Sequence, residues 1–281
     1  MRQVKYLIQE AKQNTNTTDI EAISDSLCVR LLNRAQEFIQ AHLFTANIEA
    51  KIFRGQASFT TISNVDTYQL PFNIYAKNSI NNVFYKSGNA YQDIKQISEK
   101  SRGLFSGYFC SDNKIILSPM PTSSVSMFLS YTKKIPSIGI SYGKILTVNL
   151  NLSIVIDSAS PLLTGVDDYY SIVDSNGVII KYALPIDQTG TTILISDTTN
   201  VLAGMYVIPG KYSTTHSELP DELESCLIMS LETMINARMS SKDIPISKSF
   251  GDEMLGQMIS MFSENQTDTF TPPILEYSEW V

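Results

Sequence analysis

The sequence predicts an α+β protein that has helices near both ends, strands between them and an extended C-terminal tail. Apolar residues recur at helical spacing over residues 4–43 and again over 223–239. The chain between these stretches switches to short runs in which apolar and polar residues alternate, a pattern typical of strands. Residues 263–281 have no apolar period, which indicates an extended tail.

The helical stretches divide into four expected helices. Val4, Leu7, Ile8 and Ala11 mark the first. A second runs to Leu43, and its start is predicted at Thr18 and Glu21, which have the spacing of a capping box. Pro220 suits the first turn of a third helix, which runs to Met239. The fourth is expected over 247–261.

Short strands are expected over residues 51–134. They are separated by turn residues and prolines, and Ser111-Asp112-Asn113 suits a tight turn between two of them. Residues 89–101 are expected to carry a short helix. The expected strands are 51–54, 57–62, 66–71, 80–86, 108–119 and 126–134.

Residues 137–216 differ from their surroundings in being rich in strand signals and poor in charge. Asn176-Gly177 between two apolar runs predicts a hairpin with a type I′ turn. We therefore expect an inserted all-β domain, either a barrel or a sandwich. The expected division is a core of 1–136 with 217–262, the inserted domain 137–216, and a tail 263–281.

The net charge of −7 is unevenly spread. Residues 1–136 hold 15 Lys/Arg against 10 Asp/Glu, whereas residues 217–281 hold 3 against 12. These opposite charges can attract each other between neighbouring copies, or they can simply lie on solvated faces. There is no basic stripe of the kind expected in a protein that grips nucleic acid.

The residues that could carry chemistry are few, and the sequence predicts no enzyme, cofactor or metal. The only histidines, His42 and His216, lie far apart, and there is no nucleophile elbow, phosphate loop or Cys-x-x-Cys motif. Asp167-Asp168 suit a solvated turn. Tyr169-Tyr170 suit either strand packing or a platform for a sugar or base. The cysteines, expected as buried reduced thiols, are Cys28, Cys110 and Cys226.

No run of about 18 apolar residues occurs, and the first residues lack the pattern of a secretory signal. We therefore expect no membrane partner.

Four motifs, taken in order, resemble the head-to-tail connector (portal adaptor, or neck ring) proteins of tailed bacteriophages. Their similarity covers residues 18–136 and 217–262, and it is carried by the order of the motifs. The low-charge, Asn/Ser/Ile-rich composition resembles that of crAss-like short-tailed phages. The motifs are Leu32-Asn33-Arg34-Ala35, Tyr68-Gln69-Leu70-Pro71 with Phe72-Asn73-Ile74-Tyr75, Ile115 to Pro121 followed by Met127 to Tyr131, and Leu219-Pro220-Asp221-Glu222.

The resemblance implies a helical bundle packed on a small antiparallel sheet and assembled as a ring, often a dodecamer. Such a ring in the virion neck, assembled in the host cytoplasm, contacts the portal protein and downstream neck or tail proteins. It passes packaged dsDNA through its lumen without reading sequence. The tail is expected to contact the portal, with apolar and aromatic residues that fold on binding. These residues are Ile274, Leu275, Tyr277 and Trp280.

Two other functions stay open. The Tyr-rich strands of 137–216 also suit a carbohydrate-binding module in another virion tail protein. Scattered carboxylates can come together in a fold, so a peptidoglycan hydrolase is the third hypothesis.

Overall fold

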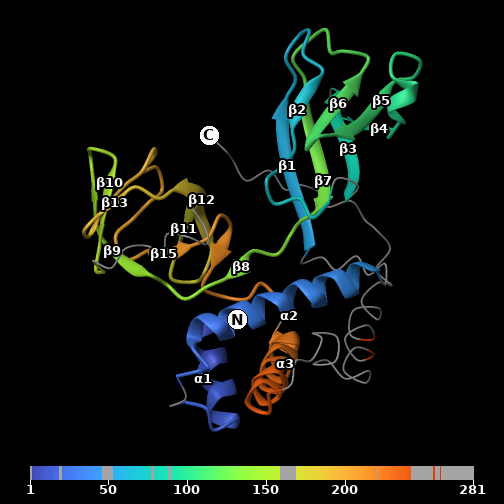
Figure 1. The fold of residues 1–281 in the computed structure, drawn as a ribbon. Coiled ribbons are helices and arrows are strands. Elements are labelled where there is room, and N and C mark those ends of the chain that lie inside the picture. Colours follow the sequence, from blue (N-terminus) through green and yellow to red (C-terminus); the bar gives the residue numbers. More distant parts are fainter. Residues whose placement is uncertain are drawn as a thin grey trace. The chain divides into compact units, whose positions relative to one another are not determined.

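The computed structural model describes residues 2–18, 21–45, 53–76, 79–87, 90–158, 169–219 and 221–241, with residues 256 and 260. The chain divides into two compact units (Figure 1). The helical unit comprises 6–50 and 219–281, and the β unit comprises 1–5 and 51–218. The predicted domain division stays a prediction.

Three helices account for the described part of the helical unit: α1 (Val4–Asn14), α2 (Asp25–Thr45) and α3 (Asp221–Met239). Their apolar stripes are buried, for example Leu7, Leu32 and Leu231, each 0% exposed. Polar contacts join them, since Lys12 Nζ lies 2.6 Å from Asp25 Oδ1 and Asn14 Nδ2 donates to Glu232 Oε1 at 2.6 Å. The first three predicted helices are therefore confirmed. Of the fourth, expected over 247–261, only residues 256 and 260 are described, and both are helical.

The start of α2 differs from the prediction. The helix begins at Asp25, and the backbone N–H of Leu27 donates to Ser24 Oγ at 3.2 Å. Ser24 is therefore the residue whose hydroxyl satisfies the first free N–H groups, and Thr18 and Glu21 precede the helix.

The first part of the β unit, residues 53–133, is a two-layer sandwich of antiparallel sheets. One sheet has the order β1-β7-β3-β4 and the other β2-β6-β5. Leu70, Ile115 and Leu117 from one layer pack with Val83 and Leu129 from the other. The strands are β1 (Arg54–Thr60), β2 (Thr67–Gln69), β3 (Ile80–Ser87), β4 (Ala90–Ile94), β5 (Gly107–Ser111), β6 (Lys114–Ser118) and β7 (Ser126–Thr132).

The second part, residues 143–209, is a seven-stranded sheet that curls into a barrel. Its edge strands, β12 and β13, follow each other in the chain with only Ile186 and Asp187 between them, so both edges meet in one segment. The core includes Tyr170, Ile154 and Ile193. In sheet order the strands are β12 (Ile179–Pro185), β11 (Tyr169–Val173), β15 (Tyr206–Pro209), β9 (Gly143–Asn149), β10 (Ser153–Ile156), β14 (Thr192–Leu194) and β13 (Gln188–Thr189).

A short parallel pair, β8 (Ser137–Ile138) with β16 (Ser213–Thr214), completes the β unit.

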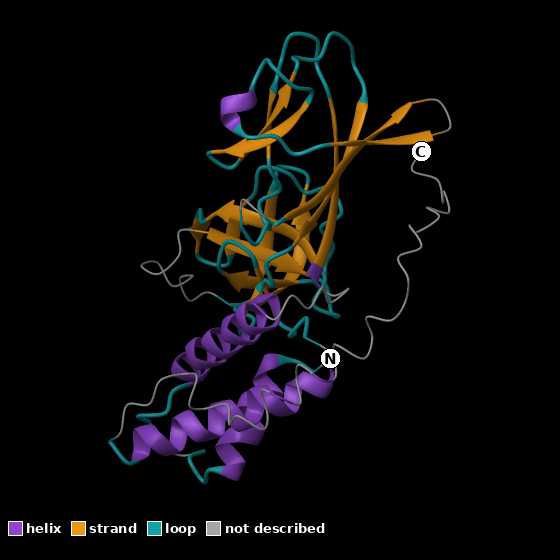
Figure 2. Cartoon of the chain, turned by 90° about the vertical axis from the view of Figure 1, so that its right-hand side faces the viewer, coloured by secondary structure: helices purple, strands orange, loops and turns teal. Residues whose placement is uncertain are grey.

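The predicted fold class is wrong, because the described residues are mostly β: 37% of them lie in strands and 25% in helices, with several sheets. The physical reason lies in the cores. The apolar clusters of the sandwich and of the barrel consist of residues from strands and their connections, with no helical residue among them. These sheets bury their apolar faces against strands, whereas a bundle on a small sheet needs helices to cover that face. Figure 2 shows the strands of the β unit in orange.

Residues 89–101 were expected to carry a short helix, and within them residues 90–94 form the strand β4, which pairs with β3. Only a single 3₁₀ turn, Glu99–Ser101, is helical in that stretch.

Candidate functional site

The candidate site is a groove in the β unit, where the sandwich meets the barrel. Two cavities adjoin there and share Phe72, Asn73 and Tyr212. The larger holds about 610 Å³ and the smaller about 350 Å³, which is in the usual range for ligand sites. We call the two cavities together the junction groove.

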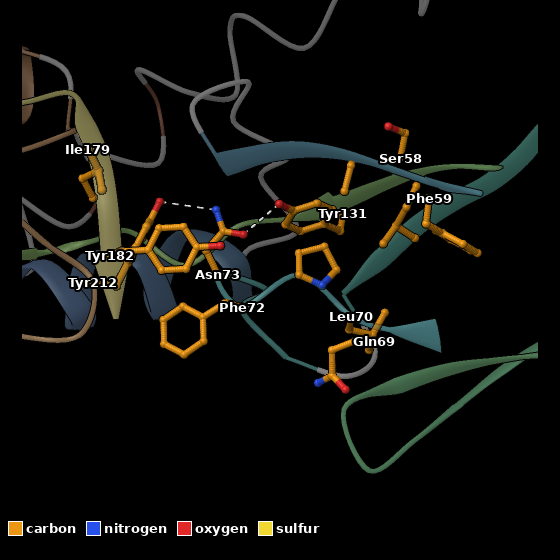
Figure 3. A pocket seen from close by; sticks show the side chains of 13 residues that line it. Ser58, Phe59, Gln69, Leu70, Phe72, Asn73, Tyr131, Ile179, Tyr182 and Tyr212 are labelled. Atoms are coloured by element: carbon orange, nitrogen blue, oxygen red, sulfur yellow. Dashed lines mark hydrogen bonds between the residues drawn. The ribbon is translucent and has the colours of Figure 1, made fainter. Parts of the chain in front are cut away.

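Aromatic rings form the wall of the larger cavity. Phe72, in the loop after β2, stacks on Tyr182 of β12 with ring centroids 5.6 Å apart. Tyr212, just before β16, meets the edges of both rings. These residues lie far apart in the chain, and Figure 3 shows them converging on one cavity.

Asn73 joins the sandwich to the segment that follows the barrel through two phenols. Tyr131 Oη of β7 donates to Asn73 Oδ1 at 2.8 Å, and Asn73 Nδ2 donates to Tyr212 Oη at 3.3 Å (Figure 3). Burial raises the pKa of Tyr131 and of Tyr212 above the usual value. Both hydroxyls therefore stay protonated at neutral pH and keep this bridge.

Cations distinguish the smaller cavity. Among its described lining residues the charged ones are Lys134 and Lys211. Lys211 Nζ lies 4.8 Å from the ring centroid of Phe72 and 5.2 Å from that of Tyr169, positions that suit cation–π attraction. The junction groove is thus aromatic in one half and positively charged in the other.

A second feature is a set of exposed apolar residues on the connecting loops of the sandwich. Ile62, Leu104, Phe105 and Met120 are 61%, 77%, 65% and 48% exposed. We call loops 61–66, 102–106 and 118–123 the loop cluster.

Polar contacts hold the loop cluster together. Arg102 Nη2 lies 2.6 Å from Asp66 Oδ2, and the N–H of Gly103 donates to Ser118 Oγ at 3.0 Å. The N–H of Asn64 donates to the carbonyl of Pro121 at 2.9 Å. Hydrogen bonds from Thr67 and Arg102 lower the pKa of Asp66, so its carboxylate is charged at neutral pH. An apolar surface held in a fixed shape is typical of a contact with another macromolecule.

The two histidines that the sequence marked for chemistry belong to different units. His42 lies in α2 beside Phe38, whereas His216 contacts Thr215 in the β unit. Burial raises the pKa of the thiols of Cys28, Cys110 and Cys226, which makes them poor nucleophiles. No group of three metal-ligating side chains occurs in the part of the chain that the structure describes.

The candidate platform Tyr169-Tyr170 is divided between the surface and the core. Tyr170 is 0% exposed inside the barrel, where it can stack on no ligand, while Tyr169 is 36% exposed and lies beside Lys211. Asp167-Asp168 and the tail residues Ile274, Leu275, Tyr277 and Trp280 fall outside the described residues.

Sequence reasoning missed the junction groove. Its residues come from separate strands and loops, so no spacing in the sequence reveals them. Phe72 and Asn73 do stand within one of the motifs that resemble the connector proteins, which was the available signal.

Comparison with known proteins gives no family. Neither the family models nor the curated proteins include a match to this chain. No helix within the described ranges is long and apolar enough to cross a membrane.

Proposed function

We propose that this chain is a structural subunit of a bacteriophage neck, which assembles as a ring beneath the portal and continues the DNA channel. In this proposal it has no catalytic role, and its partners are other copies of itself, the portal protein, and downstream neck or tail proteins. The virion neck is its location after assembly in the host cytoplasm.

The observation that carries the proposal is the loop cluster. Leu104 and Phe105 leave most of their surface in water although hydrogen bonds and an ion pair hold their loops in place. Burying apolar surface gains roughly 25 cal/mol per Å². A rigid apolar surface is therefore stabilised by a protein neighbour, as an assembly subunit provides.

The barrel supports the same proposal with a second set of exposed residues. The β9–β10 turn and its neighbour β14 expose Leu150, Leu152 and Leu194 by 105%, 46% and 50%. Two apolar surfaces on one subunit suit a ring, in which each copy meets two neighbours.

Imaging of the purified protein, alone and with portal, tests the proposal. The expected result is closed rings that stack on the portal, with more than about 2,000 Å² buried between adjacent subunits, as in obligate assemblies. Particles that remain single subunits in the presence of portal would refute it.

A truncation tests the predicted role of the tail. Removing residues 263–281 should leave thermal unfolding unchanged and abolish portal docking in a pull-down. If the truncated chain aggregates or melts at a much lower temperature, the tail belongs to the folded core.

The junction groove favours carbohydrate binding as a second candidate, because it joins aromatic rings to the amide and hydroxyl groups that sugars use. The Phe72 and Tyr182 rings stack on each other, however, and Lys211 lies over Phe72, so little ring face is left for a sugar. A glycan array probed with the full chain tests this candidate, and the absence of any bound glycan would remove it.

A further inference from the structure

The junction groove suits an extended peptide that is both acidic and aromatic. A negative side chain is attracted to Lys134 and Lys211 in the smaller cavity. An aromatic or apolar side chain packs in the larger cavity against the surface that the stacked rings of Phe72 and Tyr182 leave exposed, 42% and 48% of each residue. Adjacent side chains of an extended peptide point to opposite sides, so a peptide that runs between the two adjoining cavities can place one of two neighbouring residues in each.

The C-terminal tail of this chain has that composition. It contains two acidic–aromatic pairs, Glu276-Tyr277 and Glu279-Trp280, which follow Pro272-Pro273. Proline restricts the backbone and so lowers the entropy lost when an extended segment binds. The tail also belongs to residues 217–281, which hold 12 acidic against 3 basic residues.

From this complementarity we infer that the tail of one subunit docks in the junction groove of a neighbouring copy, with the Glu276-Tyr277 pair at Lys211 and the aromatic cavity. The inference rests on the proposed ring, since a ring holds each tail at high effective concentration beside the next groove. It gives the tail a site on the ring itself when no portal is present. The portal then competes with that site for the same tail residues.

Trp280 provides the measurement, because it is the only tryptophan in the protein. Trp280 follows Tyr277 by three residues, so in the full chain without portal the docked pair should hold the Trp280 ring against the neighbouring copy and shift its fluorescence emission to shorter wavelength. Lys211→Glu and Glu276→Lys should each move the emission back toward that of water-exposed tryptophan. Combining both reversals restores the attraction, so the double variant should recover the shift.

Lys144→Glu is the matched control. Lys144 lies on β9, is exposed, and lines neither cavity, so the same change of charge there should leave the emission as in the unmodified chain. If Lys144→Glu and Lys211→Glu change the emission equally, or if the double variant does not recover, the inference is wrong.

Rings that contain two variants together show whether a tail docks in the groove of a neighbouring copy or in its own. Co-expressing Lys211→Glu, which keeps Trp280, with Trp280→Phe, which keeps an intact groove, should restore part of the shift. No recovery in particles shown to contain both variants would contradict docking between copies.

Mass measurement on the same samples keeps the two claims apart. If the protein forms rings but Lys211→Glu leaves the Trp280 emission unchanged, this inference is wrong and the ring proposal is unaffected. If the measured mass is that of a single subunit, the ring proposal is wrong.

Discussion

The sandwich and the barrel are both antiparallel β-structures in one unit, yet they differ in how much apolar surface and strand edge they leave exposed. The barrel brings both edges of its sheet into one chain segment and fills its interior with residues such as Ile154, Tyr170 and Ile193, each fully buried. The sandwich keeps an edge strand, β4, with four exposed residues, and it carries the loop cluster. A closed core and an exposed apolar surface therefore occur in the same unit, a combination that the proposed ring would explain.

The most damaging change should lie inside the barrel. Ile154→Ala removes a fully buried side chain from a closed core, and the resulting cavity should cost about 2–5 kcal/mol in the free energy of unfolding. Denaturant unfolding measures this loss. Leu150→Ala, in the exposed turn next to β10, is the control and should change stability by less than about 0.5 kcal/mol. Equal effects of the two would mean that the barrel core is not packed as described.

Removing the Asn73 hydrogen bonds between Tyr131 and Tyr212 should cost less free energy of unfolding. Asn73→Ala removes the partner of the buried Tyr131 hydroxyl and the donor to Tyr212, and an unsatisfied buried polar group costs roughly 1–3 kcal/mol. Asn82→Ala, at an exposed position of β3, should have almost no effect in the same unfolding measurement. A neutral Asn73→Ala would show that the bridge contributes nothing to stability.

Alkaline pH should weaken both parts through their buried tyrosines. Burial raises the pKa of Tyr108 in the sandwich to about 12, and it also raises the pKa of Tyr170 in the barrel. In the unfolded chain these phenols ionise near pH 10, whereas in the folded protein they stay neutral. Their contribution is complete below pH 10 and is lost as pH rises toward 12. Thermal melts from pH 8 to 12 should show the loss, and a flat profile would contradict the burial.

The smallest effect on folding should come from the loop cluster. Replacing both Leu104 and Phe105 by Ser should alter the free energy of unfolding of the single subunit by less than about 0.5 kcal/mol per site, because these side chains are largely in water when no neighbour covers them. Assembly, followed by analytical ultracentrifugation, should nevertheless weaken strongly. If the double variant loses much of its free energy of unfolding but still assembles, the loop cluster stabilises the fold and does not contact a neighbouring copy.

Local signals in the sequence predicted local structure well. The turn expected at Ser111-Asp112-Asn113 joins β5 to β6, and Asp112 and Asn113 both have positive φ, as a tight two-residue hairpin requires. The hairpin at Asn176-Gly177 is confirmed too, but its turn type differs. Only Gly177 of that pair has positive φ, and the N–H groups of Asn176 and Val178 donate to Asp174 Oδ1.

Long-range pairing was beyond the sequence. Residues 89–101 were expected to carry a short helix, but residues 90–94 pair with β3, a partner that lies in a different segment and that no local pattern reveals. The junction groove has the same cause, since Tyr182 and Tyr212 approach Phe72 through strand order that no local pattern encodes. The helical bundle was predicted from the resemblance to connector proteins. That prediction is wrong because the sheets bury their apolar faces against other strands.

The most direct test of the central claim is the native mass of the full-length protein over a range of concentrations, with and without portal. The account predicts discrete closed rings, because the loop cluster and the exposed barrel leucines are buried only between copies. A single-subunit mass under all these conditions would contradict it.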